Sequence, residues 1–87
     1  MISVVIVSFR STSVLIQCLN ALSSEIGEGD EVIVVENSQD HRVAESPEFA
    51  RDNFTLVVNH ENLGYSKGCN QGIRMASNDQ VLLLNPD

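Results

Sequence analysis

Four short runs of aliphatic residues limit the folds open to this chain of 87 residues. The first run is almost continuously apolar, with no alternation of apolar and polar side chains. Such a run is typical of a strand that is buried on both faces of a parallel sheet. Aromatic residues make up only 5% of the chain, so the core must be aliphatic, as it usually is in such sheets. The expected strands are residues 3–9, 31–35, 54–58 (the weakest run) and 80–84.

Helical patterns separate these runs. Leu15, Cys18, Leu19 and Leu22 follow the i, i+3, i+4, i+7 spacing of an amphipathic helix, and a hydroxyl in the turn at 10–13 is expected to cap it. A short helix is expected within residues 43–52, and another over 64–75. Strands that alternate with helices predict repeated βαβ units. We therefore expect an α/β, Rossmann-like parallel sheet of about four strands, with helices on both faces.

Polar residues follow the strands of this sheet. The strand ends are Phe9–Arg10, Glu36–Asn37, residues 59–60 and residues 85–87. The carboxyl ends of parallel strands meet at one edge, and ligands bind at that edge in open α/β sheets. We expect a binding site there.

Two carboxylates at these strand ends are candidate ligand contacts. Asp87 follows Asn85 and Pro86 and could hold a divalent cation against a diphosphate, although an Asn-Pro-Asp turn is the simpler explanation of this motif taken alone. Glu36 could accept hydrogen bonds from a ribose hydroxyl or from the N–H of a base. A solvated loop acid is the open alternative for Glu36.

Glycines at 64, 68 and 72 recur on one face of the third expected helix. Each costs about 1 kcal/mol relative to alanine inside a helix, so the repeat requires a reason. Either the helix packs very close to the sheet, or a phosphate approaches its N-terminus, where Lys67 would add a positive charge. The segment matches neither GxxxxGK[ST] nor GxGxxG, so a flavodoxin-like or dinucleotide-binding oxidoreductase ranks last.

Charge and cysteine usage narrow the class of protein. The net charge is −7 and there is no basic stripe, which argues against a nucleic-acid partner. Cys18 and Cys69 belong to no metal or redox motif, and two reduced thiols are expected. Residues 1–7 are too short to span a bilayer and lack a basic flank, so we expect a cytoplasmic protein without a transmembrane segment. His41 and His60 have no metal spacing, and no hydrolase motif is visible.

Four motifs in correct order resemble the inverting glycosyltransferases of family 2, which have the GT-A fold. They are VVIVSFR (4–10, resembling VVIVTYN), EVIVVENS (31–38, resembling EVIVVDNAS), NLGYSKGCN (62–70, resembling NxGxxxGxN) and LLLNPD (82–87). The last two resemble the rhamnosyltransferase-like branch in particular. The likeness runs nearly from end to end, and it implies a transferase that uses a nucleoside-diphosphate sugar as donor.

The resemblance also implies roles for single residues. Phe9 would lie beside the nucleotide base, with Ser8 and Arg10 in the same pocket, and Glu36 would take the place of the acid that holds the base or ribose. Further contacts to the nucleotide and its diphosphate would come from Asn62, Gly64, Lys67, Asn70 and Asn85. Asp87 would coordinate Mg²⁺ or Mn²⁺ on the diphosphate.

The chain departs from the family pattern in ways that leave the base and the sugar open. Arg10 replaces the usual Asn, Glu36 the usual Asp, and Asn85 the first Asp of the DxD element. The acceptor-binding half and the catalytic base of the family follow that element, so residues 1–87 are expected to be the donor half of a longer enzyme. That enzyme would act on a polysaccharide or lipid-linked acceptor, at most peripherally at the inner face of the membrane. A non-catalytic nucleotide-binding or interaction module is the alternative, and the residues after Asp87 would discriminate the two.

Overall fold

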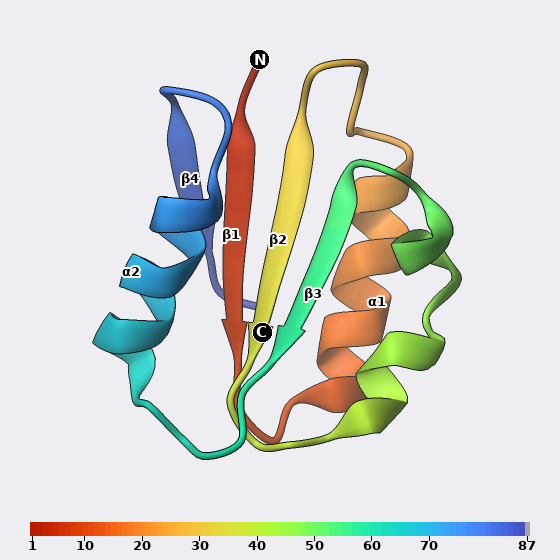
Figure 1. Cartoon of the computed structure of the whole chain (residues 1–87). Helices are drawn as coiled ribbons and strands as arrows, with labels where there is room; N and C mark the ends of the chain where they lie inside the picture. Colours follow the sequence, from red (N-terminus) through yellow and green to blue (C-terminus); the bar gives the residue numbers. More distant parts are fainter. Residues whose placement is uncertain (87) are drawn as a thin grey trace.

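The computed structural model describes residues 1–86 and contains one parallel sheet of four strands (Figure 1). The strands pair in the order β3-β2-β1-β4, so the first strand lies inside the sheet and the third and fourth lie at its edges. The predicted α/β, Rossmann-like fold is confirmed. The elements in chain order are β1 (Ser3–Ser8), α1 (Thr12–Ser23), β2 (Glu31–Glu36), η1 (His41–Glu45), η2 (Pro47–Ala50), β3 (Phe54–Val58), α2 (Tyr65–Met75) and β4 (Val81–Leu84).

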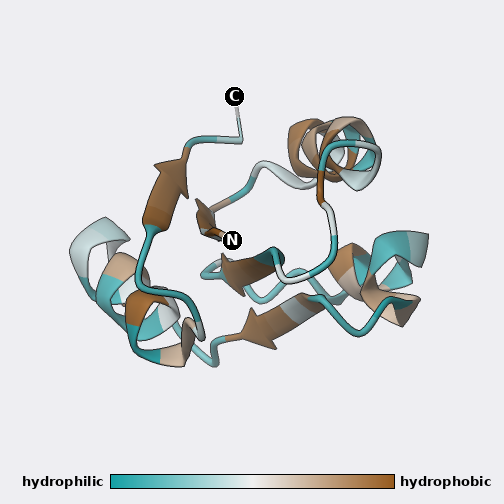
Figure 2. Ribbon diagram, turned by 90° about the horizontal axis from the view of Figure 1, so that it is seen from above, coloured by the Kyte–Doolittle hydropathy of each residue, from teal (hydrophilic) through white to brown (hydrophobic). Residues whose placement is uncertain are grey.

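Helices cover both faces of the sheet, as predicted, with α1 on one face and α2 on the other (Figure 2). Alternate residues of β1 point to opposite faces. Val4 and Ile6 join Leu15 and Leu19 of α1 in the main core, and all four are at most 3% exposed. The same core contains Val32, Val34, Val43 and Phe54.

Two glycines let α2 approach the sheet closely. A Cβ on Gly68 would lie 2.9 Å from Val7 Cγ1, and a Cβ on Gly72 would lie closer still to Val5 Cγ1. Close packing therefore explains both of these positions. Gly64 differs, because it precedes α2 with a φ of 83° and has open space around it. Its left-handed backbone is a conformation that glycine adopts without strain.

The short helix expected within residues 43–52 is instead two 3₁₀ helices, η1 and η2. Ser46 lies between them in an extended conformation, with φ −63° and ψ 129°. The ring of Pro47 disfavours helical geometry in the residue before it, and this interrupts the helix.

The predicted hydroxyl cap of α1 was wrong. Ser11 occupies the N-cap position without a side-chain capping bond, and its Oγ donates to the Phe9 carbonyl at 3.0 Å. Thr12 Oγ1 donates to Asp40 Oδ2 at 2.5 Å. Both hydroxyls are thus engaged in holding the loop between β1 and α1.

Candidate functional site at the carboxyl edge of the sheet

The ends of three neighbouring strands lie together at one edge of the sheet. Ser8 of β1 pairs with Glu36 of β2, and Glu36 pairs with Val58 of β3. The backbone continues this register past the strands, because Asn37 N donates to the Ser8 carbonyl at 2.8 Å and Asn59 N donates to the Glu36 carbonyl at 2.9 Å. The predicted convergence of these three strand ends is confirmed.

Ser8 and Glu36 are both completely buried at this edge. One Glu36 oxygen, Oε2, accepts from Ser38 N at 2.6 Å, from Asp40 N at 3.3 Å and from Ser38 Oγ. The other, Oε1, has no hydrogen-bond partner within residues 1–86, and neither has Ser8 Oγ. A buried polar atom without a partner costs about 1–3 kcal/mol. Glu36 is therefore not the solvated loop acid of the alternative reading.

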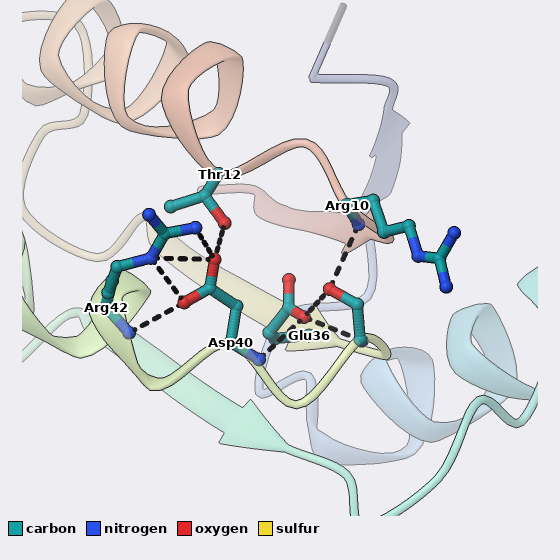
Figure 3. A network of polar contacts seen from close by, with 6 residues as sticks. Arg10, Thr12, Glu36, Asp40 and Arg42 are labelled. Atoms are coloured by element: carbon teal, nitrogen blue, oxygen red, sulfur yellow. Dashed lines mark hydrogen bonds and ion pairs between the residues drawn. The ribbon is translucent and has the colours of Figure 1, made fainter.

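Phe9 and Arg10 follow the end of β1 at this edge, in the β1–α1 loop. The Phe9 ring is 44% exposed, and the Arg10 guanidinium carbon lies 5.1 Å from the centre of the ring. Arg10 has a φ of 53°, a left-handed conformation that is uncommon for a side chain of this size. Its backbone N–H donates to Ser38 Oγ at 3.0 Å (Figure 3).

A pocket of about 210 Å³ opens beside these residues. Of the predicted contacts, the pocket brings together Phe9, Arg10 and Asn62, whereas Ser8 and Glu36 do not line it. Lys67 and Asn70 are exposed on α2, and Asn85 is exposed after β4, but none of the three lines the pocket. The other lining residues are Asn37, Ser38, Gln39 and Glu61.

Side-chain amides hold the start of α2 against this edge. Asn37 Nδ2 donates to the Gly64 carbonyl at 3.1 Å, and Asn37 Oδ1 accepts from Asn59 Nδ2 at 2.7 Å. Asn59 and Gln71 exchange two hydrogen bonds, at 2.9 and 3.0 Å. Asn62 Oδ1 accepts from Gly64 N at 2.9 Å, so this predicted residue shapes the turn into α2.

A second and larger hollow, of about 810 Å³, lies between the start of α1 and the 3₁₀ helices. Asp40 bridges its two sides by accepting from Arg42 Nη2 at 2.6 Å and from Thr12 Oγ1. The bond from Arg42, followed by the one from Thr12, holds the pKa of Asp40 well below its usual range. Figure 3 shows this cluster and Arg10 on different sides of Glu36, with the Arg10 side chain pointing away from Arg42.

Ser38 is one of the pocket residues that were not predicted from the sequence. It lines the smaller pocket, binds Glu36 through both N and Oγ, and accepts from the Arg10 backbone. A signal was present, because a serine two residues after a strand-end acid is well placed for local hydrogen bonds.

The metal prediction rests on Asp87, which lies outside the described residues. Within residues 1–86, no group of three His, Cys, Asp or Glu side chains could hold a metal ion. Neither α1 nor α2 is long and apolar enough to cross a membrane.

Two solved structures share this fold over 99% of the chain. S. aureus TarS is 23% identical with a TM-score of 0.82, which shows the fold alone. The mannosyltransferase PcManGT from Pyrobaculum calidifontis, solved in complex with GDP-Man and Mn²⁺, is 25% identical with a TM-score of 0.74. The chain spans 16% of the TarS chain and 27% of the PcManGT chain. No curated protein sequence matches it.

The sequence profile of glycosyl transferase family 2 matches residues 3–87. The match includes all four strands and both α-helices. The chain therefore belongs to glycosyl transferase family 2.

Proposed function

We propose that this chain is the donor half of an inverting glycosyltransferase and binds a nucleoside-diphosphate sugar at the carboxyl edge of its sheet. The observation that carries the proposal is the pair of buried oxygens, Ser8 Oγ and Glu36 Oε1, which lack partners within residues 1–86, while the adjacent Phe9 is exposed. The imide N–H of a base or a ribose hydroxyl would supply the donor that Glu36 Oε1 lacks. Phe9 offers a stacking surface, and stacking a base on an aromatic ring is worth about 1–3 kcal/mol.

The loop residues above Glu36 must move for this contact to form. Glu36 is completely buried, and the two non-glycine residues of 1–86 with left-handed backbone, Arg10 and Gln39, lie in the loops after β1 and β2. Such conformations cost of order 1–3 kcal/mol each and concentrate at ligand sites. We propose that these loops open to admit the base and close over it.

The diphosphate side of the site is proposed from the other strand ends. Asn62, Gly64, Lys67 and Asn70 would border the diphosphate at the start of α2, with Asn85 beyond β4. Asp87 would hold Mg²⁺ or Mn²⁺, which would neutralise charge on the leaving nucleoside diphosphate. PcManGT, which holds GDP-Man and Mn²⁺, supports this assignment by likeness.

The rest of the enzyme is proposed by analogy with the family. The LLLNPD motif favours the rhamnosyltransferase-like branch and a polysaccharide or lipid-linked acceptor. The acceptor site and the catalytic base would lie outside residues 1–87. Cys18 and Cys69 are both free thiols, which fits a cytoplasmic enzyme, at most peripheral to the membrane.

Thermal unfolding with UDP, dTDP and GDP, each with Mn²⁺, tests nucleotide binding. At least one nucleotide should raise the melting temperature, and Glu36→Gln should reduce the rise, because an amide cannot accept at both oxygen positions. Glu48→Gln is the matched control, since Glu48 of η2 is also buried but accepts from Ser46 Oγ and lies outside the smaller pocket. No shift with any of the three nucleotides would refute the proposal.

A further inference from the structure

Arg10 combines an unfavourable backbone with a guanidinium that forms no ion pair with any of residues 1–86. Its φ of 53° is a conformation that glycine or asparagine adopts more easily, and left-handed backbone costs roughly 1–2 kcal/mol for most residues. Within residues 1–86 its guanidinium contacts the Phe9 ring but no carboxylate. Backbone strain at a ligand site is a reason to look for a function of the side chain.

A relay of hydrogen bonds fixes this conformation. Glu36 Oε2 accepts from Ser38 Oγ, and the same Ser38 oxygen accepts from Arg10 N at 3.0 Å. The buried Glu36 charge thereby orients the Ser38 hydroxyl so that its lone pair faces the Arg10 N–H. The side chain of Arg10 is then directed across Phe9 and away from the Asp40–Arg42 pair (Figure 3).

The pocket that Arg10 lines reaches the loop that leads into α2. Glu61 and Asn62 line the same pocket, and they lie four and three residues before Tyr65, where α2 begins. Glu61 is the only acid that lines it among the described residues, and it forms no ion pair with Arg10. In a chain of net charge −7, an unpaired guanidinium at this place favours an anionic group of the ligand.

We propose that Arg10 recognises a phosphate group of the donor nucleotide and that Glu36, acting through Ser38, is a positioning residue for it. The inference rests on the proposed function, and it assigns the two Glu36 oxygens different tasks. Oε1 would accept a hydrogen bond from the base, whereas Oε2 binds Ser38, which in turn fixes the Arg10 backbone and so the direction of the guanidinium. A guanidinium fork matches two phosphate oxygens, and asparagine at this position could not supply that charge.

The test compares each nucleoside diphosphate with its nucleoside. Isothermal titration of the chain with UDP and uridine, and with GDP and guanosine, gives the affinity gained from the phosphates. Arg10→Asn keeps a residue that tolerates left-handed backbone and removes the guanidinium. It should weaken diphosphate binding about 10- to 100-fold and leave nucleoside binding unchanged. Arg74→Asn, which makes the same charge change in the last turn of α2, should change neither.

Variants of Ser38 test the relay separately. Ser38→Ala should weaken diphosphate binding without changing nucleoside binding, and Ser38→Thr, which keeps the hydroxyl, should restore it. Unchanged diphosphate affinity in Arg10→Asn, or an equal loss for nucleoside and diphosphate, would overturn the phosphate assignment. Failure of Ser38→Ala to affect binding would overturn the relay. If the unaltered chain binds no nucleoside and no diphosphate, the proposed function itself fails.

Discussion

Replacing Gly72 by alanine tests whether close contact between α2 and the sheet stabilises the fold. The new methyl group would meet Val5 Cγ1 closer than real Cβ contacts come, and a second Val5 methyl at 3.3 Å. Val5 is 1% exposed and lies on β1, which has a paired strand on each side, so neither Val5 nor its backbone can move aside easily. The clash should therefore force α2 away from the sheet.

The expected loss in the free energy of unfolding of Gly72→Ala follows from two opposed effects. Overpacking a buried site costs about 1–3 kcal/mol, and the rigid position of Val5 puts this site at the upper end. Alanine regains about 1 kcal/mol of helix propensity over glycine, which leaves a net loss of about 2 kcal/mol. For a domain of this size, such a loss lowers the melting temperature by roughly 10 °C.

Urea unfolding of Gly72→Ala, followed by circular dichroism, gives the change in the free energy of unfolding. Asn70→Ala, at an exposed position of the same helix, is the control and should gain about 0.5 kcal/mol. Val5→Ala removes the methyl groups that the new Cβ meets, so the Gly72→Ala change should be less harmful in that background, with a coupling of about 1 kcal/mol or more. A Gly72→Ala protein as stable as the unaltered chain would refute the close-packing explanation.

Asp40→Asn should reduce the loss of stability on acidification. Arg42 holds the pKa of Asp40 below its usual range, so the stability that Asp40 contributes is present above the ordinary Asp pKa of about 4 and disappears as the pH falls toward the lower pKa of the folded chain. Thermal unfolding of both proteins across this acid range checks the prediction, and melting temperatures that fall equally with pH in the variant and the unaltered chain would contradict it. Arg51→Ala should cost about 1–2 kcal/mol in urea unfolding, because the guanidinium donates to the Ser23 carbonyl at 2.8 Å and caps the end of α1; an unchanged midpoint would contradict this. Asp87→Asn should abolish the part of nucleotide-induced thermal stabilisation that depends on Mn²⁺ and keep the part seen in EDTA, and an unchanged Mn²⁺ response would remove Asp87 from the metal site.

The fold was predictable because its determinants are local. Continuous aliphatic runs marked the strands, and the order of strands and helices fixes a parallel sheet. The inner strands β1 and β2 are almost wholly buried, whereas Leu82 and Leu83 of the edge strand β4 are 46% and 44% exposed, so the expectation of a buried strand was wrong there. The break between η1 and η2 was also visible in principle, since Pro47 restricts Ser46. The glycine repeat allowed two explanations, and only the distances to Val5 and Val7 show that close packing accounts for Gly68 and Gly72.

The position of the candidate site at the carboxyl edge was predictable, but its side-chain contacts were not. Phe9, Arg10 and Glu36 were predicted at the carboxyl edge because they follow or end strands, and their place there depends only on the parallel register. The complete burial of Glu36 and the left-handed backbone of Arg10 are properties of the folded chain, and the Arg10 backbone is bound by Ser38, 28 residues further along the sequence. A tertiary hydrogen bond of that kind leaves no periodic signal in the sequence.

The distribution of unfavourable features over the molecule supports a binding role for the carboxyl edge. The buried strands carry Val, Ile and Leu. Among residues 1–86, the two unsatisfied buried side-chain atoms and both non-glycine residues with left-handed backbone lie at or just beyond the ends of β1 and β2. Each of these features lowers the stability of the unliganded chain, and a ligand that donates to Glu36 and accepts from Arg10 would satisfy two of the groups involved. A residue that is costly for folding and useful for binding should, when replaced, weaken nucleotide binding without lowering stability. Arg10→Asn is such a replacement. If it changed neither the stability of the chain nor its affinity for nucleotide, the strained backbone of Arg10 would have no role in binding.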